Sequence, residues 1–164
     1  PALSLILLNI RSTHNVGAIF RTADAMGVKK IYLSGYTPEP FDLFGKLRKD
    51  FAKTALDAEK YVSWEKVKNI GALIKKLRLE KVFIASLEQS SLSIKLGSLA
   101  SKLLSNRIAK SRVALILGNE VKGIPKSILK SSDAVLEIPM RGKKESLNVS
   151  VAAGIALYAL SQGN

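Results

Sequence analysis

Three stretches of the chain carry side chains that can hold a polar substrate and stabilise charge. Residues 9–27 place a polar loop before a helix-like pattern, residues 118–125 form a glycine-bounded loop with a carboxylate, and residues 138–153 form a basic loop that leads into an alanine-rich segment. The candidate polar and charged positions in these stretches are Asn15, Arg21, Glu120, Ser146 and Asn148. A cation, a carboxylate and amides suit binding, orientation and electrostatic stabilisation of a reacting group.

Several kinds of catalysis are excluded by composition. His14 is the one histidine, and no Gly-x-Ser-x-Gly sequence is present to supply a nucleophile for it, so a hydrolase triad is improbable. A single histidine in a chain without cysteine also lacks the donors of a catalytic zinc site. We therefore expect no metal, and we expect His14 to lie in a loop.

The familiar phosphate-binding loops are absent as well. Residues 118–123 have the glycine spacing of such a loop, but Ile124 and Pro125 stand where lysine and serine or threonine are needed. No Gly-x-Gly-x-x-Gly follows the first apolar run, so an ordinary dinucleotide site has no support. A nucleotide-like cofactor would have to be held in another way.

The elements that position these stretches alternate along the chain. Apolar runs predict strands at residues 3–8, 30–33, 81–85, 112–117 and 134–138, and helical spacing predicts helices at residues 15–26, 64–79, 96–104 and 147–160. Residues 35–40 read as a loop, and 52–59 as a helical turn or two within a stretch that is otherwise hard to place. This alternation favours an α/β fold with a mostly parallel sheet flanked by helices. We expect one domain over residues 1–164, with no separate N-terminal RNA-binding domain.

Charge gives the clearest indication of a partner. The chain has 26 lysines and arginines against 13 acidic residues, a net charge of +13. Because the cations are spread along the chain rather than along one amphipathic helix, nucleic acid is favoured over a membrane surface; a merely soluble, lysine-rich surface is the alternative. The first apolar run is too short to span a membrane, and the absence of cysteine suits a reducing compartment. We expect a cytoplasmic protein.

Together, the three stretches resemble the SpoU (TrmH) family of RNA ribose methyltransferases, in the SPOUT superfamily. The similarity lies in an ordered trio: Asn-x-Gly-x-x-x-Arg-Thr-Ala from Asn15, Gly-x-Glu-x-x-Gly from Gly118, and Ser-Leu-Asn-Val-Ser-Val-Ala from Ser146. The resemblance implies a C-terminal part threaded into a deep trefoil knot, a homodimer, and S-adenosylmethionine as methyl donor. General folding rules alone argue against a knot.

The resemblance also assigns roles to residues. It implies that the donor is held by Leu117, Gly118, Ile138, Met140 and Leu147, and that Arg21, Asn15, Glu120, Ser146 and Asn148 form the catalytic centre. The family proposal treats the arginine as a base, but a guanidinium retains its proton near neutral pH. We expect Arg21 to act as a cation that stabilises charge on the ribose oxygen.

Plainer interpretations of the same residues stay open. Arg21 and Asp24 have the spacing of an exposed helix ion pair, Glu120 suits a helix start, and Ser146 and Asn148 suit helix caps.

Loop cations are the expected RNA contacts. We expect Arg11, Arg141, Lys143 and Lys144 to bind RNA, with a solvated basic loop as the alternative. A second candidate patch contains Lys46, Arg48 and Lys49.

The expected reaction is methyl transfer to a ribose 2′-hydroxyl of structured RNA, with transfer RNA slightly favoured over ribosomal RNA because it is compact. The rival interpretations are a basic RNA-binding protein of this fold without catalysis, and a base-methylating relative.

Overall fold

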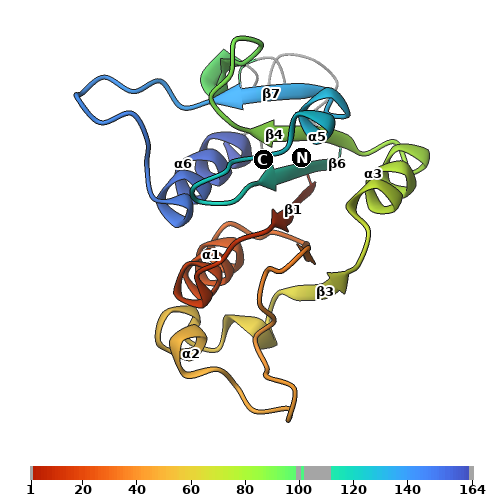
Figure 1. Ribbon diagram of the computed structural model, residues 1–164, viewed down its shortest axis with the longest axis vertical. Coiled ribbons are helices and arrows are strands. Elements are labelled where there is room, and N and C mark those ends of the chain that lie inside the picture. Colours follow the sequence, from red (N-terminus) through yellow and green to blue (C-terminus); the bar gives the residue numbers. More distant parts are fainter. Residues whose placement is uncertain (1, 99–100, 102–111, 163–164) are drawn as a thin grey trace.

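Seven parallel strands form one sheet in the order β3-β2-β1-β6-β4-β7-β5 (Figure 1). The computed structural model describes residues 2–98, 101 and 112–162. The strands are β1 (Ala2–Leu8), β2 (Lys30–Ser34), β3 (Ser63–Val67), β4 (Phe83–Leu87), β5 (Ile94–Lys95), β6 (Arg112–Leu117) and β7 (Ala134–Glu137). The helices are α1 (Thr13–Ala25), α2 (Lys49–Ala55), α3 (Ile70–Leu79), α5 (Lys126–Lys130) and α6 (Val149–Ser161), with a 3-10 turn at Ala58–Lys60. The predicted α/β class with a parallel sheet is confirmed.

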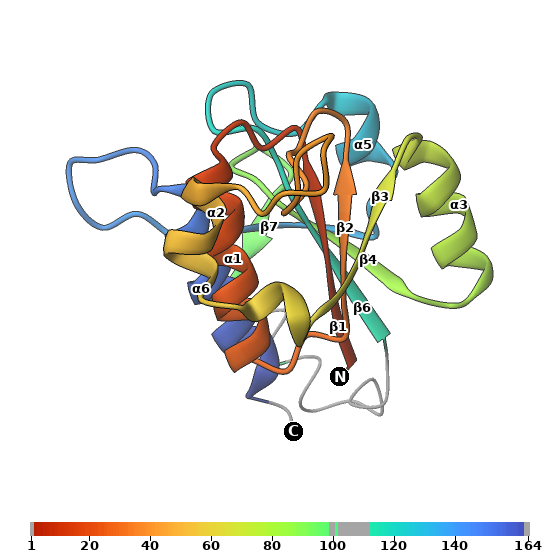
Figure 2. The same cartoon turned by 90° about the horizontal axis from the view of Figure 1, so that it is seen from below.

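Helices cover both faces of the sheet. Helices α1, α2 and α6 lie on one face, and α3 and α5 lie on the other (Figure 2). Each face has its own apolar core: Phe20, Phe51 and Leu157 belong to the first, and Leu73 and Ile128 to the second. Because both faces are covered, the central strands are apolar throughout rather than alternating.

The two helices next to the candidate site begin with side-chain caps. Ser12 Oγ accepts a hydrogen bond from Asn15 N at 3.1 Å at the start of α1. Asn148 Oδ1 accepts from Ser150 N at 2.9 Å at the start of α6. Such caps satisfy amides that the first helical turn leaves free. Helix α1 ends before Gly27, whose φ of +67° explains the glycine there.

The helix predicted over residues 64–79 is wrong in its first part. Ser63–Val67 forms β3, an edge strand that pairs with β2, and α3 begins only at Ile70. Asn69 is the N-cap of α3, since its Oδ1 accepts from Ala72 N at 3.0 Å. Edge strands are half exposed, so β3 lacks the apolar run that identifies a buried strand. The asparagine was the local signal for the true helix start.

Other differences are small and concern short elements. Helix α2 and the 3-10 turn occupy the region where one or two helical turns were expected. Strand β5 and helix α5 were not predicted; both are too short for a periodic pattern. His14 lies in the first turn of α1 rather than in a loop. Residues 96–98 and 101 are helical, and the rest of the predicted helix 96–104 lies outside the described residues.

Parallel pairing brings the carboxyl ends of all the strands to one edge of the sheet. Loops after β1, β2 and β6 gather there, as Figure 2 shows. The strand register explains why these loops lie close together, because Leu7 near the end of β1 pairs with both Leu33 of β2 and Leu117 of β6. Ligands of open α/β sheets bind at this edge.

Candidate active site

A cavity of about 760 Å³ opens at this edge, between the loops that follow β4, β6 and β7. The five predicted donor-binding residues, Leu117, Gly118, Ile138, Met140 and Leu147, all line it. Glu120 and Ser146 line it as well, whereas Asn15, Arg21 and Asn148 do not. The second and third stretches of the sequence therefore enclose one cavity of a size typical of cofactor sites.

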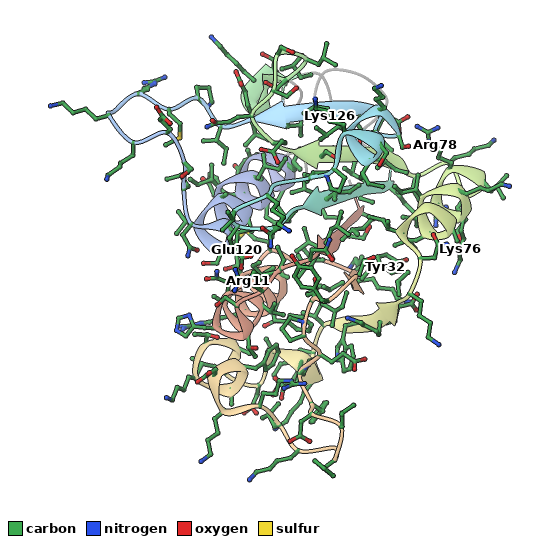
Figure 3. The ribbon with its side chains drawn as sticks, in the orientation of Figure 1. Arg11, Tyr32, Lys76, Arg78, Glu120 and Lys126 are labelled. Carbon is green, nitrogen blue, oxygen red and sulfur yellow. The ribbon has the colours of Figure 1, made fainter. Side chains whose placement is uncertain are left out.

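Glu120 joins the cavity to the first stretch. Its carboxylate accepts hydrogen bonds from Arg11 N at 3.0 Å, Ser12 N at 3.2 Å and Asn15 Nδ2 at 3.3 Å. Figure 3 shows Glu120 next to Arg11 between the loops after β1 and β6. Glu120 therefore lies at the start of a helix, as the plainer interpretation expected. That helix is α1, more than a hundred residues earlier in the sequence, and not the helix that follows Glu120.

These contacts set the ionisation of Glu120. Burial alone would raise the pKa of this carboxyl group, but the backbone amides of Arg11, Glu120 and Ser12 and the side chain of Asn15 donate to its charged form. The net effect is a pKa below the ordinary value. Glu120 is thus a carboxylate at neutral pH, and its lone pairs are engaged by the protein.

Asn148 connects the third stretch to the same network. Its Nδ2 donates to Asn15 Oδ1 at 3.1 Å, while its Oδ1 caps α6. The cap alternative for Asn148 is therefore confirmed, and it is compatible with a place in the site. The Asn15 side chain is buried; it accepts a hydrogen bond from Asn148 and donates one to Glu120. The predicted polar residues Asn15, Glu120 and Asn148 therefore form one chain of hydrogen bonds.

Glycine is required at two positions of the loop after β6. A Cβ on Gly118 would lie 2.5 Å from Ile124 Cγ1 and 2.8 Å from Ile124 N. Gly123 has a φ of +68°, and a Cβ there would meet the carboxylate of Glu88. Around Gly142, by contrast, a Cβ would find nothing within 4 Å.

The sequence interpretation missed Glu88 and Gln89, which follow β4. Glu88 Oε2 accepts from Ile124 N at 2.9 Å, and Gln89 Nε2 donates to Glu145 O at 2.8 Å. Both residues line the cavity, so consecutive side chains tie the loop after β6 to the loop before α6. The only sequence signal was a polar pair directly after an apolar strand.

A second, smaller cavity of about 420 Å³ shares a wall with the first. It is lined by Arg11, Tyr36, Asn119, Val121 and Lys122, of which the last three also line the larger cavity. Asn119 Nδ2 donates to the Tyr36 hydroxyl and to Asn9 O, both at 2.9 Å. The smaller cavity thus combines an aromatic ring with two cations beside the larger one.

Arg21 lies apart from this network. It is exposed on α1 and lines neither cavity. Within the described part of the chain Arg21 forms no ion pair, so the alternative of a pair with Asp24 is not supported. Within a single chain Arg21 therefore does not share a cavity with Glu120 and Ser146, two other residues of the implied catalytic centre.

The other predicted RNA contacts lie on exposed loops. Arg141, Lys143 and Lys144 are all exposed on the segment between β7 and α6, which extends away from the body of the molecule in Figures 1 and 2. Arg11 lies next to the active-site network but is also exposed. These positions leave each cation accessible to a polyanion.

Two further findings concern what the described residues lack. No group of three histidine, aspartate or glutamate side chains among them is placed to hold a metal ion. None of their helices has the length and hydrophobicity needed to cross a membrane.

Residues 2–158 match the SpoU rRNA Methylase family. The chain belongs to this family. A relative, the 23S rRNA (guanosine-2'-O-)-methyltransferase RlmB of Coxiella burnetii, is 32% identical over 162 residues, which are 99% of this chain and 59% of the relative. The chain thus spans less than two thirds of the length of this relative.

Solved structures agree with the family assignment. The A. aeolicus TrmH/SpoU tRNA modifying enzyme superposes with a TM-score of 0.80 at 28% identity, covering 98% of this SpoU-family chain and 74% of the other. The AdoMet-bound rRNA methyltransferase of Sinorhizobium meliloti gives a TM-score of 0.81 at 26% identity, covering 97% and 55%. The fold is therefore that of the SpoU/TrmH methyltransferases.

Proposed function

We propose that this chain transfers a methyl group from S-adenosylmethionine to a ribose 2′-hydroxyl of structured RNA. The observation that carries the proposal is the cavity enclosed by the second and third sequence stretches, in a chain of the SpoU family. The relative from Coxiella burnetii is named for 2′-O-methylation of a guanosine in 23S rRNA, which supports the same reaction class.

The cavity suits the donor. Leu117, Ile138, Met140 and Leu147 supply apolar walls for an adenine, and the backbone near Gly118 supplies polar groups for its edge. Bound there, the donor supplies an activated methyl group attached to a sulfonium. The protein side chains hold it in one orientation, which is a large part of the catalysis of an in-line displacement.

The acceptor enters from the side of the smaller cavity. Arg11 and Lys122 can bind RNA phosphates there, and Tyr36 presents a ring to a base. The shared wall of Asn119, Val121 and Lys122 puts a nucleotide in this cavity next to the donor. Arg141, Lys143 and Lys144 contact RNA farther from the reacting atoms. A compact RNA such as transfer RNA is the preferred substrate.

Arg21 stabilises the oxygen as it loses its proton. We assign it the role of a cationic hydrogen-bond donor, which contributes roughly 3 kcal/mol in comparable sites. Because Arg21 does not line the cavities of its own chain, it acts on an acceptor held partly by a second copy. The polar network of Asn15, Glu120 and Asn148 keeps the loops in place, and Ser146 lies at the cavity wall near the transfer centre.

A homodimer fits the surface next to Arg21. Val151, Ile155 and Tyr158 are 50%, 41% and 60% exposed and lie on one face of α6. Helix α6 packs closely beside α1. A Cβ added to Gly154 of α6 would lie 3.6 Å from Thr22 Cγ2 of α1. A second copy that covers this apolar face would come close to Arg21. The trefoil knot of the C-terminal part also stays a prediction, based on family membership.

The test is methyl transfer from radiolabelled S-adenosylmethionine to total RNA, with wild type and Arg21→Ala side by side, followed by nucleoside analysis. We expect label in 2′-O-methylnucleosides, and a loss of about a hundredfold in the variant. Label in a methylated base would overturn the ribose assignment. RNA binding without donor binding would instead identify a non-catalytic RNA-binding protein.

A further inference from the structure

The turn between β2 and α2 exposes two large apolar side chains next to each other. Leu43 is 98% exposed and Phe44 is 96% exposed. Single exposed apolar residues are common on protein surfaces, whereas these two adjacent ones form a small exposed apolar patch at the tip of a turn. Neither residue contributes to the core or to the cavities of the active site.

The turn is well ordered despite this exposure. Asp42 Oδ1 accepts from Phe44 N at 2.9 Å and from Lys46 N at 3.0 Å. Two backbone hydrogen bonds also close the turn: Asp42 N donates to Lys46 O at 2.8 Å, and Gly45 N donates to Asp42 O at 3.0 Å. Gly45 has a φ of +76°, which favours glycine. These bonds fix the backbone of the turn, so a partner that binds there orders less backbone than it would in an open loop.

Exposed lysines follow the patch closely in sequence. Lys46, Lys49 and Lys53 are exposed, and within the described residues none of the three forms an ion pair. Lys49 and Lys53 lie one turn apart on α2, so they share a face. The carboxylate of Asp42 is engaged by the turn itself. An exposed aromatic ring followed closely in sequence by exposed lysines is a combination suited to single-stranded nucleic acid, through stacking on a base and phosphate contacts.

The position of the turn links it to the active site. It follows β2, whose carboxyl end lies on the same edge of the sheet as that of β6, and only β1 separates the two strands. In Figure 1 the loop between β2 and α2 extends at the opposite end of the molecule from β7. An RNA that reaches the cavities along this edge can therefore continue to the turn.

We propose that Leu43 and Phe44, with Lys46, Lys49 and Lys53, form a docking site for an unpaired nucleotide of the RNA substrate. Phe44 stacks on the base, Leu43 packs beside it, and the lysines bind the flanking phosphates. This inference rests on the proposed function, because it takes RNA as the partner. It adds a second contact, remote from the reacting ribose, that selects RNAs with an unpaired nucleotide at a matching distance.

The experiment measures the affinity of the full chain for unfractionated transfer RNA and for a fluorescent oligouridylate. We compare wild type with Phe44→Ala, Phe44→Trp and a matched control, Leu79→Ala, since Leu79 is 79% exposed at the end of α3 on the other face of the sheet. We expect Phe44→Ala to weaken binding about tenfold, Phe44→Trp to bind at least as tightly as wild type, and the control to be unchanged. Affinity for S-adenosylmethionine should be the same in all four proteins.

Lysine variants test the phosphate contacts. Lys49→Gln and Lys53→Gln should each lower the slope of log affinity against log salt concentration by roughly 0.7, the value for one lost phosphate contact with a single strand. Phe44→Ala should leave this slope unchanged, because stacking releases no counterions.

Some results would overturn the proposal. One is a Phe44→Ala protein that binds both RNAs as tightly as the Leu79→Ala control. Another is unchanged RNA affinity together with an altered oligomeric state in sedimentation, which would assign the turn to a contact with a second copy. Failure of the proposed function is distinguishable, because it appears as missing methyl transfer by the wild type, whereas the docking site is judged by RNA affinity alone.

Discussion

Asn148 donates a hydrogen bond from its Nδ2 to Oδ1 of Asn15 at 3.1 Å, although 133 residues separate the two in sequence. This bond joins the start of the last helix to the first turn of the first helix. Asn15 also donates to Glu120, so the starts of α1 and α6 and the loop after β6 share one polar network.

The Asn148→Asp variant tests the helix cap apart from the hydrogen bond to Asn15, because it should keep the first contact and lose the second. An aspartate retains the acceptor for Ser150 N but loses the donor to Asn15. Asn148→Ala loses both, and we expect it to lower the free energy of unfolding by about 1 kcal/mol more than the aspartate variant. Both variants should lose methyl transfer. Urea unfolding and methyl-transfer assays check these outcomes, and equal stability of the two variants would contradict the cap.

Glu120 should make the stability of the chain depend on pH. Its pKa in the folded protein is lowered, so its ionised form stabilises the fold at pH values above the pKa of the unfolded chain. This contribution is lost as the pH falls through the lowered folded pKa. Thermal unfolding of wild type and Glu120→Gln should therefore differ most near neutral pH, and the difference should shrink once the pH falls below about 4.3. A difference that is constant with pH would contradict this role.

Gly118→Ala should disturb the donor cavity. The added methyl group would meet Ile124 and force the loop after β6 to move, so we expect affinity for S-adenosylmethionine to fall at least tenfold. Gly142→Ala is the matched control, because a Cβ there meets nothing within 4 Å. Calorimetric titration of the donor into both variants makes the comparison. Equal affinities would show that the loop has room for the methyl group.

Glu88→Ala should weaken binding of the methyl donor, although the apolar residues that line the cavity remain in place. The variant leaves Ile124 N and Gln89 N without their acceptor, and an unsatisfied amide costs about 1–3 kcal/mol where water does not replace the partner. We expect KM for the donor to rise about tenfold while KM for RNA is unchanged. Glu145→Ala is the control, since Gln89 donates to the backbone oxygen of Glu145, which the variant retains. A rise in both KM values would indicate general loosening of the fold.

Tyr158→Glu tests the proposed homodimer. Tyr158 is 60% exposed on the apolar face of α6, so a charge there would be tolerated in a monomer but would oppose burial between two copies. We expect sedimentation to change from dimer to monomer and methyl transfer to fall, while donor binding remains. A wild-type protein that sediments as a monomer and is fully active would contradict both the dimer and the assignment of Arg21 to the acceptor of a second copy.

Much of the site could be predicted from local sequence. The apolar runs at β1, β4, β6 and β7 identify buried strands because parallel sheets bury both faces. The glycines at 118 and 123 and the polar residues 15, 120 and 148 stand in short spacings that are read without knowledge of the fold. The residues predicted to hold the donor all proved to line one cavity.

Tertiary structure alone decided how these parts meet. Strand order places β6 between β1 and β4, and nothing in the local pattern of an apolar strand states which strand will be its neighbour. That order brings Glu120 to Arg11 and Ser12, and Glu88 to Ile124. It also leaves Arg21 outside the cavities of its own chain. The periodicity of apolar residues indicates how one segment is buried. A site at the edge of a parallel sheet depends instead on which strands lie side by side, and packing across the whole fold decides that order.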